Sequence, residues 1–358
     1  MCRKVYEDEW KSKLRQSPPV IRACVLRHCV TGSEGFIGSH VVETLLRRGH
    51  EVKALVQYNS RSEIGWLEEL QIVDPGTRLE IVLGDLRDPG LVNTVVEGCD
   101  AAINLAALIA IPHSYSSPRS YIDTNVLGTH NFLEACRTSG VKRVVQLSTS
   151  EVYGSAVYVP MDEGHPLSAQ SPYAATKIAS DQLAFSYNKS FGLPVVVARP
   201  FNAFGPRQSL RAVVPSIILQ AISGDGKVKL GSTSSTRDFT HVQDLAAGLA
   251  DILESDRGEG EVFNLGSGFE ISISDVVQLV SQILDVELEI EAEEGRFRPE
   301  NSEVSRLYSD SRKAQSVFGW GTFSESPLER FTSRLAETAS WFAQNQSSYA
   351  GDLRTFRY

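Results

Sequence analysis

The sequence has few cysteines, no long apolar run and no concentrated basic segment. Its five cysteines are odd in number and lack CxxC spacing, which argues against a disulfide framework or a zinc site and favours the reducing cytoplasm. No apolar run approaches the roughly 20 residues of a membrane-spanning helix. Because the net charge is −9 and the basic residues are scattered, neither nucleic acid nor an anionic membrane is an expected partner.

The composition is that of a globular chain. With 358 residues, of which 42% are hydrophobic and 22% charged, it can bury a sizeable core in two domains or one large α/β unit. The opening residues 1–23 carry acidic side chains and a tryptophan where a secretion signal would have its apolar core. We therefore expect an N-terminal extension that lies outside the fold.

Short apolar runs such as "CVLRHCV" and "HEVKALV" alternate with helix-like stretches such as "HVVETLLRRG". This alternation predicts an α/β fold with a Rossmann-like, doubly wound parallel sheet over residues 24–200, with returns near 237–266. A smaller C-terminal α/β lid, mainly over residues 201–345, should bind the substrate. Ligands of such sheets lie at the carboxyl ends of the strands, so the lid would close a substrate against a cofactor. Arg27 and His28 do not fit a buried first strand.

The glycine-rich segment "CVTGSEGFIGSH" lies at the first strand-to-helix junction. Gly32 would permit the tight turn, Gly35 the close approach of a pyrophosphate, and Gly38 the packing of the helix. Phe36 and Ile37 would open that helix, whose N-terminus favours an anion. An ordinary tight turn is the alternative, but the position within a βαβ series predicts dinucleotide binding.

The second strand, within "HEVKALVQYNSR", is not followed by the Asp or Glu that binds the adenosine ribose of NAD. Asn59 and Arg61 occupy that region and could accept a 2′-phosphate, although Arg61 could equally be a solvated loop residue. The sequence therefore leans slightly to NADP over NAD. Asp85 and Leu86, in "GDLRD", would suit an adenine edge, although an exposed turn acid would look the same.

Thr149, Tyr173 and Lys177 form the most informative set. Tyr173 and Lys177 are four residues apart and would share one helix face. A nearby cation would lower the pKa of the phenol from about 10, so that the phenolate could take a proton from a sugar hydroxyl. Thr149, at a strand end, could hydrogen-bond the same hydroxyl. Tyr and Lys at this spacing are often only a surface pair, but the glycine loop and Thr149 make a catalytic role the better interpretation.

Eight segments occur in this order over roughly residues 25–325: "TGSEGFIGSH", "GDLRD", "NLAA", "STSEVYG", "YAATK", "RPFNAFGPRQ", "RDFTHVQDLA" and "NLGSG". Together they resemble the extended short-chain dehydrogenase/reductases that act on nucleotide sugars, the NAD-dependent epimerase/dehydratase family. Within it, the chain is most similar to the N-acetylhexosamine 4,6-dehydratases of the legionaminic-acid type of pathway, through the runs "STSEVYGSAVYVPMDEGHPLSAQSPYAATK", "YNSRSEIGWLEEL" and "RPENSEVSRLYSD". The resemblance implies a nucleotide-sugar substrate, a tightly bound NAD or NADP and a homodimer.

The same resemblance assigns roles to further residues. It implies that Ala106 contacts the cofactor, that Asn125 supports the active site, and that Asn202, Arg237 and Arg298 bind the substrate diphosphate. A helix-capping role would explain Asn125 equally well. The homodimer would form through helices that carry apolar positions, although these could simply face the sheet: Leu127, Phe132, Leu183 and Phe185.

Glu151 fits a 4,6-dehydration. Once Tyr173 has taken the proton of the 4-hydroxyl and hydride has left C4, the ketone acidifies the hydrogen on C5, which Glu151 can remove before water leaves C6. Many similar dehydratases have Asp in place of Ser150 to protonate the leaving hydroxyl, so Glu151 or a water must do so, or the reaction differs. The alternatives are a nucleotide-sugar glucuronate decarboxylase, a 4-epimerase and, from another class, a non-catalytic cofactor-sensing protein.

Overall fold

The computed structural model describes residues 25–73, 78–224, 226–297, 299–322 and 324–349, so the predicted extension over residues 1–23 lies outside the described residues. Seven parallel strands form the main sheet in the order β10-β6-β5-β4-β1-β2-β3. They are β1 (Arg27–Thr31), β2 (Glu51–Gln57), β3 (Leu79–Gly84), β4 (Ala101–Asn104), β5 (Arg143–Leu147), β6 (Val195–Pro200) and β10 (Val262–Leu265). The predicted Rossmann-like sheet is confirmed, and its strand order reverses between β1 and β4, where such folds bind ligands.

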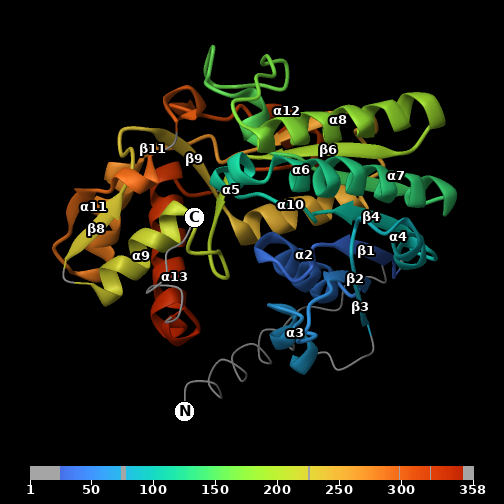
Figure 1. Ribbon diagram of the computed structural model, residues 1–358, viewed down its shortest axis with the longest axis horizontal. Helices are drawn as coiled ribbons and strands as arrows, with labels where there is room; N and C mark the ends of the chain where they lie inside the picture. Colours follow the sequence, from blue (N-terminus) through green and yellow to red (C-terminus); the bar gives the residue numbers. More distant parts are fainter. Residues whose placement is uncertain (1–24, 74–77, 225, 298, 323, 350–358) are drawn as a thin grey trace.

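Helices cover both faces of the main sheet (Figure 1). One layer contains α2 (Phe36–Arg47) and α10 (Val242–Glu254), and the other contains α4 (Pro89–Val96), α7 (Gly128–Thr138) and α8 (Pro172–Phe191). Successive side chains of β1 face opposite layers, because Val30 packs with the first and Cys29 with the second. Within the described residues, no helix combines the length and the hydropathy needed to cross a membrane.

The structure of β1 shows how Arg27 and His28, which did not fit a buried strand, are accommodated. Arg27 lies at the exposed start of β1 and pairs with Glu51 at 3.0 Å. His28 is fully buried, with its ring centroid 4.9 Å from that of His50. Burial lowers the pKa of His28 to about 4, so the imidazole is neutral at physiological pH and is accommodated in the core without a counter-charge.

The ends of helix α8 are encoded locally. Ser171 caps its N-terminus by accepting a hydrogen bond from a backbone amide of the first turn, and Pro172 occupies the first helical position. Gly192 ends the helix in the left-handed region, with φ +69°. Because both ends are fixed, the direction in which Tyr173 and Lys177 project is fixed as well.

Short strands and the remaining long helices form a second group of elements beside the main sheet (Figure 1). They are β7 (Asn202–Phe204), α9 (Val213–Ser223), β8 (Lys227–Leu230), β9 (Thr236–His241), β11 (Glu270–Ser272), α11 (Ile273–Leu284), β12 (Glu289–Ala292), β13 (Arg306–Leu307) and α13 (Pro327–Gln344). β9 pairs with β11, β13 and β7, and β12 pairs with β8. α9, α11 and α13 enclose an apolar core of their own. Between these elements the chain returns to the main sheet through β10.

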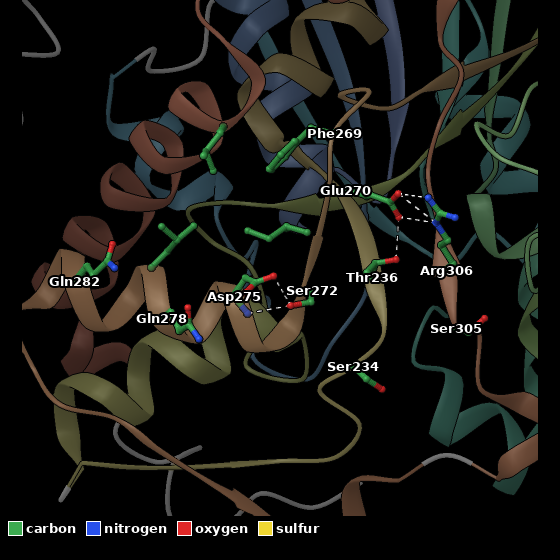
Figure 2. Close-up of a pocket in the computed structure, with 13 residues that line it drawn as sticks. Ser234, Thr236, Phe269, Glu270, Ser272, Asp275, Gln278, Gln282, Ser305 and Arg306 are labelled. Atoms are coloured by element: carbon green, nitrogen blue, oxygen red, sulfur yellow. Dashed lines mark hydrogen bonds and ion pairs between the residues drawn. The ribbon is translucent and has the colours of Figure 1, made fainter.

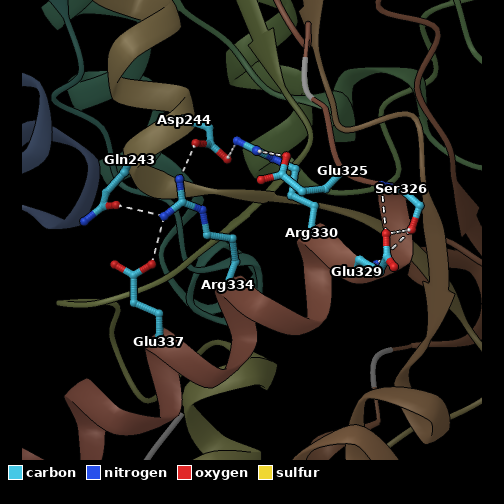
Figure 3. Close-up of polar contacts among 8 residues, drawn as sticks. All are labelled: Gln243, Asp244, Glu325, Ser326, Glu329, Arg330, Arg334 and Glu337. Carbon is cyan, nitrogen blue, oxygen red and sulfur yellow. Dashed lines mark hydrogen bonds and ion pairs between the residues drawn. The ribbon is translucent and has the colours of Figure 1, made fainter.

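A network of ion pairs joins α13 to α10. The carboxylate of Asp244 on α10 pairs with Arg330 at 2.7 Å and with Arg334 at 2.9 Å, both on α13 (Figure 3). The start of α13 is fixed by a capping box between Ser326 and Glu329. Because α10 covers the main sheet and α13 belongs to the second core, Asp244 connects the two parts of the molecule.

Candidate active site

Gly32 and Gly38 are required by the packing of the loop between β1 and α2. Gly32 has φ +64°, and a Cβ added to it would lie 2.8 Å from the backbone N of Ala106. A Cβ at Gly38 would lie 2.1 Å from the carbonyl oxygen of Gly32. A Cβ at Gly35, in contrast, would make only an ordinary contact of 3.4 Å with the protein. Packing therefore does not require the glycine at position 35, which leaves the backbone there open to a ligand.

The N-terminus of α2 provides an anion-binding position at the carboxyl end of β1. Gly35 is its N-cap, no side chain caps it, and the first helical residues Phe36 and Ile37 are only partly buried. The backbone N–H of Ala106, after β4, donates to Thr31 Oγ1 at 3.1 Å and so fixes the second wall of this crevice. These features fit the pyrophosphate of a dinucleotide.

The loop after β2 contains Asn59 and Arg61, the two residues predicted to bind a 2′-phosphate. The side-chain oxygen of Asn59 accepts the backbone N–H groups of Arg61 and Glu63, at 3.1 and 3.0 Å, and thus shapes its own loop. The Arg61 side chain is 80% exposed and pairs with Glu63 at 3.4 Å. Asn59 thus shapes the loop, whereas the Arg61 side chain stays accessible at the surface, and the predicted phosphate-binding role of both residues stays a prediction.

The turn after β3 has a largely structural explanation. The side chain of Arg87 pairs with Asp85 and holds the pKa of that carboxyl below its usual value. Leu86 is buried, and a Cβ added to Gly128 would lie 2.7 Å from its side chain, so it packs against the start of α7. Asp85 remains partly exposed at the sheet edge where an adenine ring would lie.

Thr149, Glu151 and Tyr173 lie together at the carboxyl end of β5. Thr149 is the N-cap of a short 3₁₀ helix, η2 (Ser150–Tyr153), and its hydroxyl accepts the backbone N–H of Glu151 at 3.2 Å. A hydrogen bond with Thr149 lowers the pKa of Tyr173, whereas the neighbouring charge of Glu151 raises it. Thr149 and Glu151 are partly exposed, but Ser150 is buried. The structure therefore places a hydroxyl and a carboxylate beside the phenol.

The predicted lowering of the phenol pKa is wrong for the protein alone. Burial raises the pKa of Tyr173 above its ordinary value and outweighs the hydrogen bond with Thr149. Burial also lowers the pKa of Lys177 to about 8, and its Nζ donates to the carbonyl oxygen of Leu147 at 2.6 Å. Both groups thus keep their protons near neutral pH in the protein alone.

Asp181 is a charged residue of this region that the sequence analysis missed. It is fully buried one helical turn beyond Lys177, and its charge opposes the lowering of the Lys177 pKa. Its carboxylate accepts the Ser148 hydroxyl at 2.8 Å and pairs with Arg199 on β6 at 2.9 Å. The continued spacing of four residues from Tyr173 through Lys177 was the available signal.

Asn125 supports the catalytic helix and does not cap a helix. It is buried inside a π-helical turn, η1 (Ile122–Leu127). Its amide nitrogen donates to Thr176 Oγ1 on α8 and to the carbonyl oxygen of Leu108, both at 3.0 Å. Its amide oxygen accepts the Leu108 N–H at 2.9 Å. Asn125 therefore joins α8 to the chain that follows β4.

Two of the predicted substrate residues lie on paired strands. Asn202 begins β7, and its buried Oδ1 has no hydrogen-bond partner among the described residues. Arg237, on β9 next to β7, is buried and pairs with Glu303 at 3.3 Å. An unsatisfied amide oxygen and a guanidinium suit hydroxyl and phosphate groups, respectively. Arg298 lies outside the described residues.

A cleft of about 820 Å³ lies elsewhere, between β9, β11, β13 and α11 (Figure 2). Its polar lining includes Thr236, Glu270 and Arg306, which hydrogen-bond or pair with one another. Thr236 precedes Arg237 on β9, so the two side chains project to opposite faces of the strand. None of the predicted catalytic residues lines this cleft. It is therefore separate from the candidate active site.

Comparison with protein families gives one match, the GDP-mannose 4,6-dehydratase family, over residues 29–325. The chain belongs to this family. The chain is similar to a dTDP-glucose 4,6-dehydratase of Streptomyces antibioticus, with 32% identity over 89% of this chain and 92% of the relative. A trifunctional UDP-glucose 4,6-dehydratase, epimerase and reductase of Arabidopsis thaliana is 30% identical over 88% of this chain. The chain spans only 47% of the length of that relative.

Solved structures agree with the family. One is the dTDP-glucose 4,6-dehydratase DesIV of Streptomyces venezuelae, which was solved with NAD bound. It matches with a TM-score of 0.80 and 31% sequence identity, and the match covers 91% of this chain and 99% of the DesIV chain. A UDP-N-acetylglucosamine 4-epimerase of Methanobrevibacter ruminantium has a TM-score of 0.76 and 29% identity, covering 90% and 99%. The resemblance to enzymes that act on nucleotide sugars is thus confirmed at the level of this 4,6-dehydratase family. The resemblance to the N-acetylhexosamine type stays a prediction.

Proposed function

We propose that this protein is an NAD(P)-dependent nucleotide-sugar 4,6-dehydratase. The observation that supports this most is the position of Glu151, whose charge acts on the buried phenol of Tyr173. Oxidation at C4 needs only Tyr173, Thr149 and Lys177. A second base beside them is what removal of a proton from the neighbouring carbon requires.

The residues would act in sequence. Thr149 holds the 4-hydroxyl, and Tyr173 takes its proton. A bound nicotinamide dinucleotide supplies the hydride acceptor for C4, the later hydride donor for C6 and, when oxidised, a positive charge beside the phenol. Such a charge would offset the burial that now raises the pKa of Tyr173. Glu151 then removes the C5 proton that the new ketone has acidified.

Glu151 is also the acid that best suits the leaving hydroxyl. Ser150 is buried at the start of η2 and is a far weaker acid than a carboxyl group. Once Glu151 has taken the C5 proton, it can return this proton to the 6-hydroxyl, which leaves as water. The elimination needs no other acid. When hydride then reaches C6, C5 takes a proton from solvent through Glu151, and the proton that Tyr173 took from the 4-hydroxyl returns to solvent, so the reaction balances as loss of one water.

For the substrate we propose a nucleoside diphosphate linked to an N-acetylglucosamine-type sugar. Arg237 would bind its diphosphate and exchange its contact with Glu303. Asn202 would donate its amide N–H to the same diphosphate, and its unsatisfied Oδ1 would accept a hydroxyl of the substrate. Incubation of the purified protein with a panel of nucleotide sugars, followed by mass spectrometry, tests this assignment. A product lighter by 18 mass units, as loss of water requires, is expected. A product lighter by 44 would indicate decarboxylation, and an isomer of unchanged mass would indicate 4-epimerisation.

We also propose a cytoplasmic homodimer. Leu127 on η1 is 49% exposed and Phe191 at the end of α8 is 57% exposed, so this side of the molecule presents apolar surface. Phe132, in contrast, is fully buried against the main sheet, and Leu183 packs against the same core, so these positions have a structural explanation. A Leu127→Asp variant should weaken self-association in analytical ultracentrifugation. A monomeric wild-type protein at micromolar concentration would refute the dimer.

A further inference from the structure

Glu34 brings a carboxylate to the place where the second strand lacks one. It lies in the glycine loop between Gly32 and Gly35, and its Oε1 accepts the backbone N–H of Gln57 at 3.0 Å. Gln57 is the last residue of β2. In dinucleotide-binding sheets, the acid that recognises the adenosine ribose follows this strand. In this protein the glycine loop instead places an acid, Glu34, at the end of β2.

The other oxygen of this carboxylate is unsatisfied. Glu34 Oε2 is buried and has no hydrogen-bond partner among the described residues. A buried carboxylate oxygen without a donor is unfavourable, so such an atom in a binding crevice indicates a ligand donor. The surrounding backbone holds Glu34 in place, because Trp66 donates its N–H to the Glu34 carbonyl at 3.3 Å. Gly65 packs so closely that an added Cβ would lie 2.8 Å from that same carbonyl oxygen.

We infer that Glu34 accepts a hydrogen bond from the 2′-hydroxyl of the adenosine ribose and thereby selects NAD over NADP. This inference rests on the dinucleotide site of the proposed function. A 2′-phosphate would replace the donor by an anion, which the carboxylate would repel. Arg61, the predicted phosphate partner, is exposed and paired with Glu63. The preference is therefore the opposite of the one that the sequence of the second strand suggests.

A competition experiment with the full-length protein tests the inference. The protein is equilibrated with equal concentrations of NAD and NADP, separated from unbound dinucleotide and denatured, and the released dinucleotides are quantified. Wild type should release predominantly NAD. Glu34→Gln keeps an oxygen for the Gln57 N–H but removes the charge, so the ratio of NAD to NADP should fall by roughly 10- to 100-fold, as loss of a charge-assisted hydrogen bond predicts.

Glu68→Gln is the matched control, because it removes an exposed carboxylate from the neighbouring helix α3 (Leu67–Val73) and leaves the pair of Arg61 and Glu63 intact, so its ratio should equal that of wild type. A wild-type protein that retains NADP as well as NAD would overturn the inference without any variant. A Glu34→Gln protein that is folded, as judged by its melting temperature, and that keeps the wild-type ratio of NAD to NADP would also overturn the inference. Selective NAD binding without any sugar product would refute the proposed function alone, whereas a protein that binds neither NAD nor NADP would refute both.

Discussion

Replacement of Glu151 by glutamine should separate the two halves of the proposed reaction. Tyr173 and Lys177 would remain on α8, so oxidation at C4 should continue. Removal of the Glu151 charge should even lower the pKa of Tyr173, because that charge raises it. The amide cannot accept the C5 proton, so dehydration should slow by about 10²–10⁴-fold, which corresponds to roughly 3–5 kcal/mol in activation free energy.

Two measurements follow the two steps. Rapid-mixing absorbance should show reduced nicotinamide that forms and persists in the variant, since hydride leaves C4 but no elimination consumes the ketone. In deuterated water, the wild-type product should carry deuterium at C5. Dehydration by Glu151→Gln at the wild-type rate would show that another group is the base. Ser150→Ala is the companion variant, and a modest loss of activity is expected because Ser150 is buried.

Three further changes test other parts of the structure. Tyr173→Phe should abolish product formation while the melting temperature stays near that of wild type, and appreciable product would exclude Tyr173 as the base. Lys177 has a pKa of about 8 in the folded state and about 10.5 when unfolded, so only the unfolded state binds its proton between these values. The free energy of unfolding, measured by denaturant titration, should therefore rise by on the order of 3 kcal/mol as the pH rises across this window. The same rise in a Lys177→Met variant would show that Lys177 is not its cause. Asp244→Ala removes the partner that Arg330 and Arg334 share and should lower the free energy of unfolding by about 1.5–3 kcal/mol. An unchanged denaturation midpoint would mean that this ion-pair network does not stabilise the fold.

The features that the sequence predicted depend on short-range spacing. Gly32 and Gly38 follow a strand and open a helix, so the turn requires them wherever that unit occurs. Tyr173 and Lys177 share a helix face because they are four residues apart, and the cap and the terminating glycine of α8 lie beside them in the sequence. The parallel sheet follows similarly from alternating apolar runs.

The features that the sequence did not predict depend on contacts between distant segments. Glu34 reaches the end of β2, 23 residues away, so a search for an acid after that strand could not find it. The pKa of Tyr173 depends on burial, which residue spacing does not reveal, and its predicted direction was wrong for this reason.

The residues that we propose for oxidation at C4 and for removal of the C5 proton lie on separately supported pieces of backbone. α8 is anchored by the buried pair of Asp181 and Arg199, whereas Glu151 belongs to a four-residue 3₁₀ turn that begins immediately after Thr149. A substitution in that turn could change the fate of a 4-keto sugar without moving the residues that form it. If the proposed reaction is correct, exchange of one small segment would suffice to change the chemistry on this fold, which this chain shares with a 4-epimerase at a TM-score of 0.76.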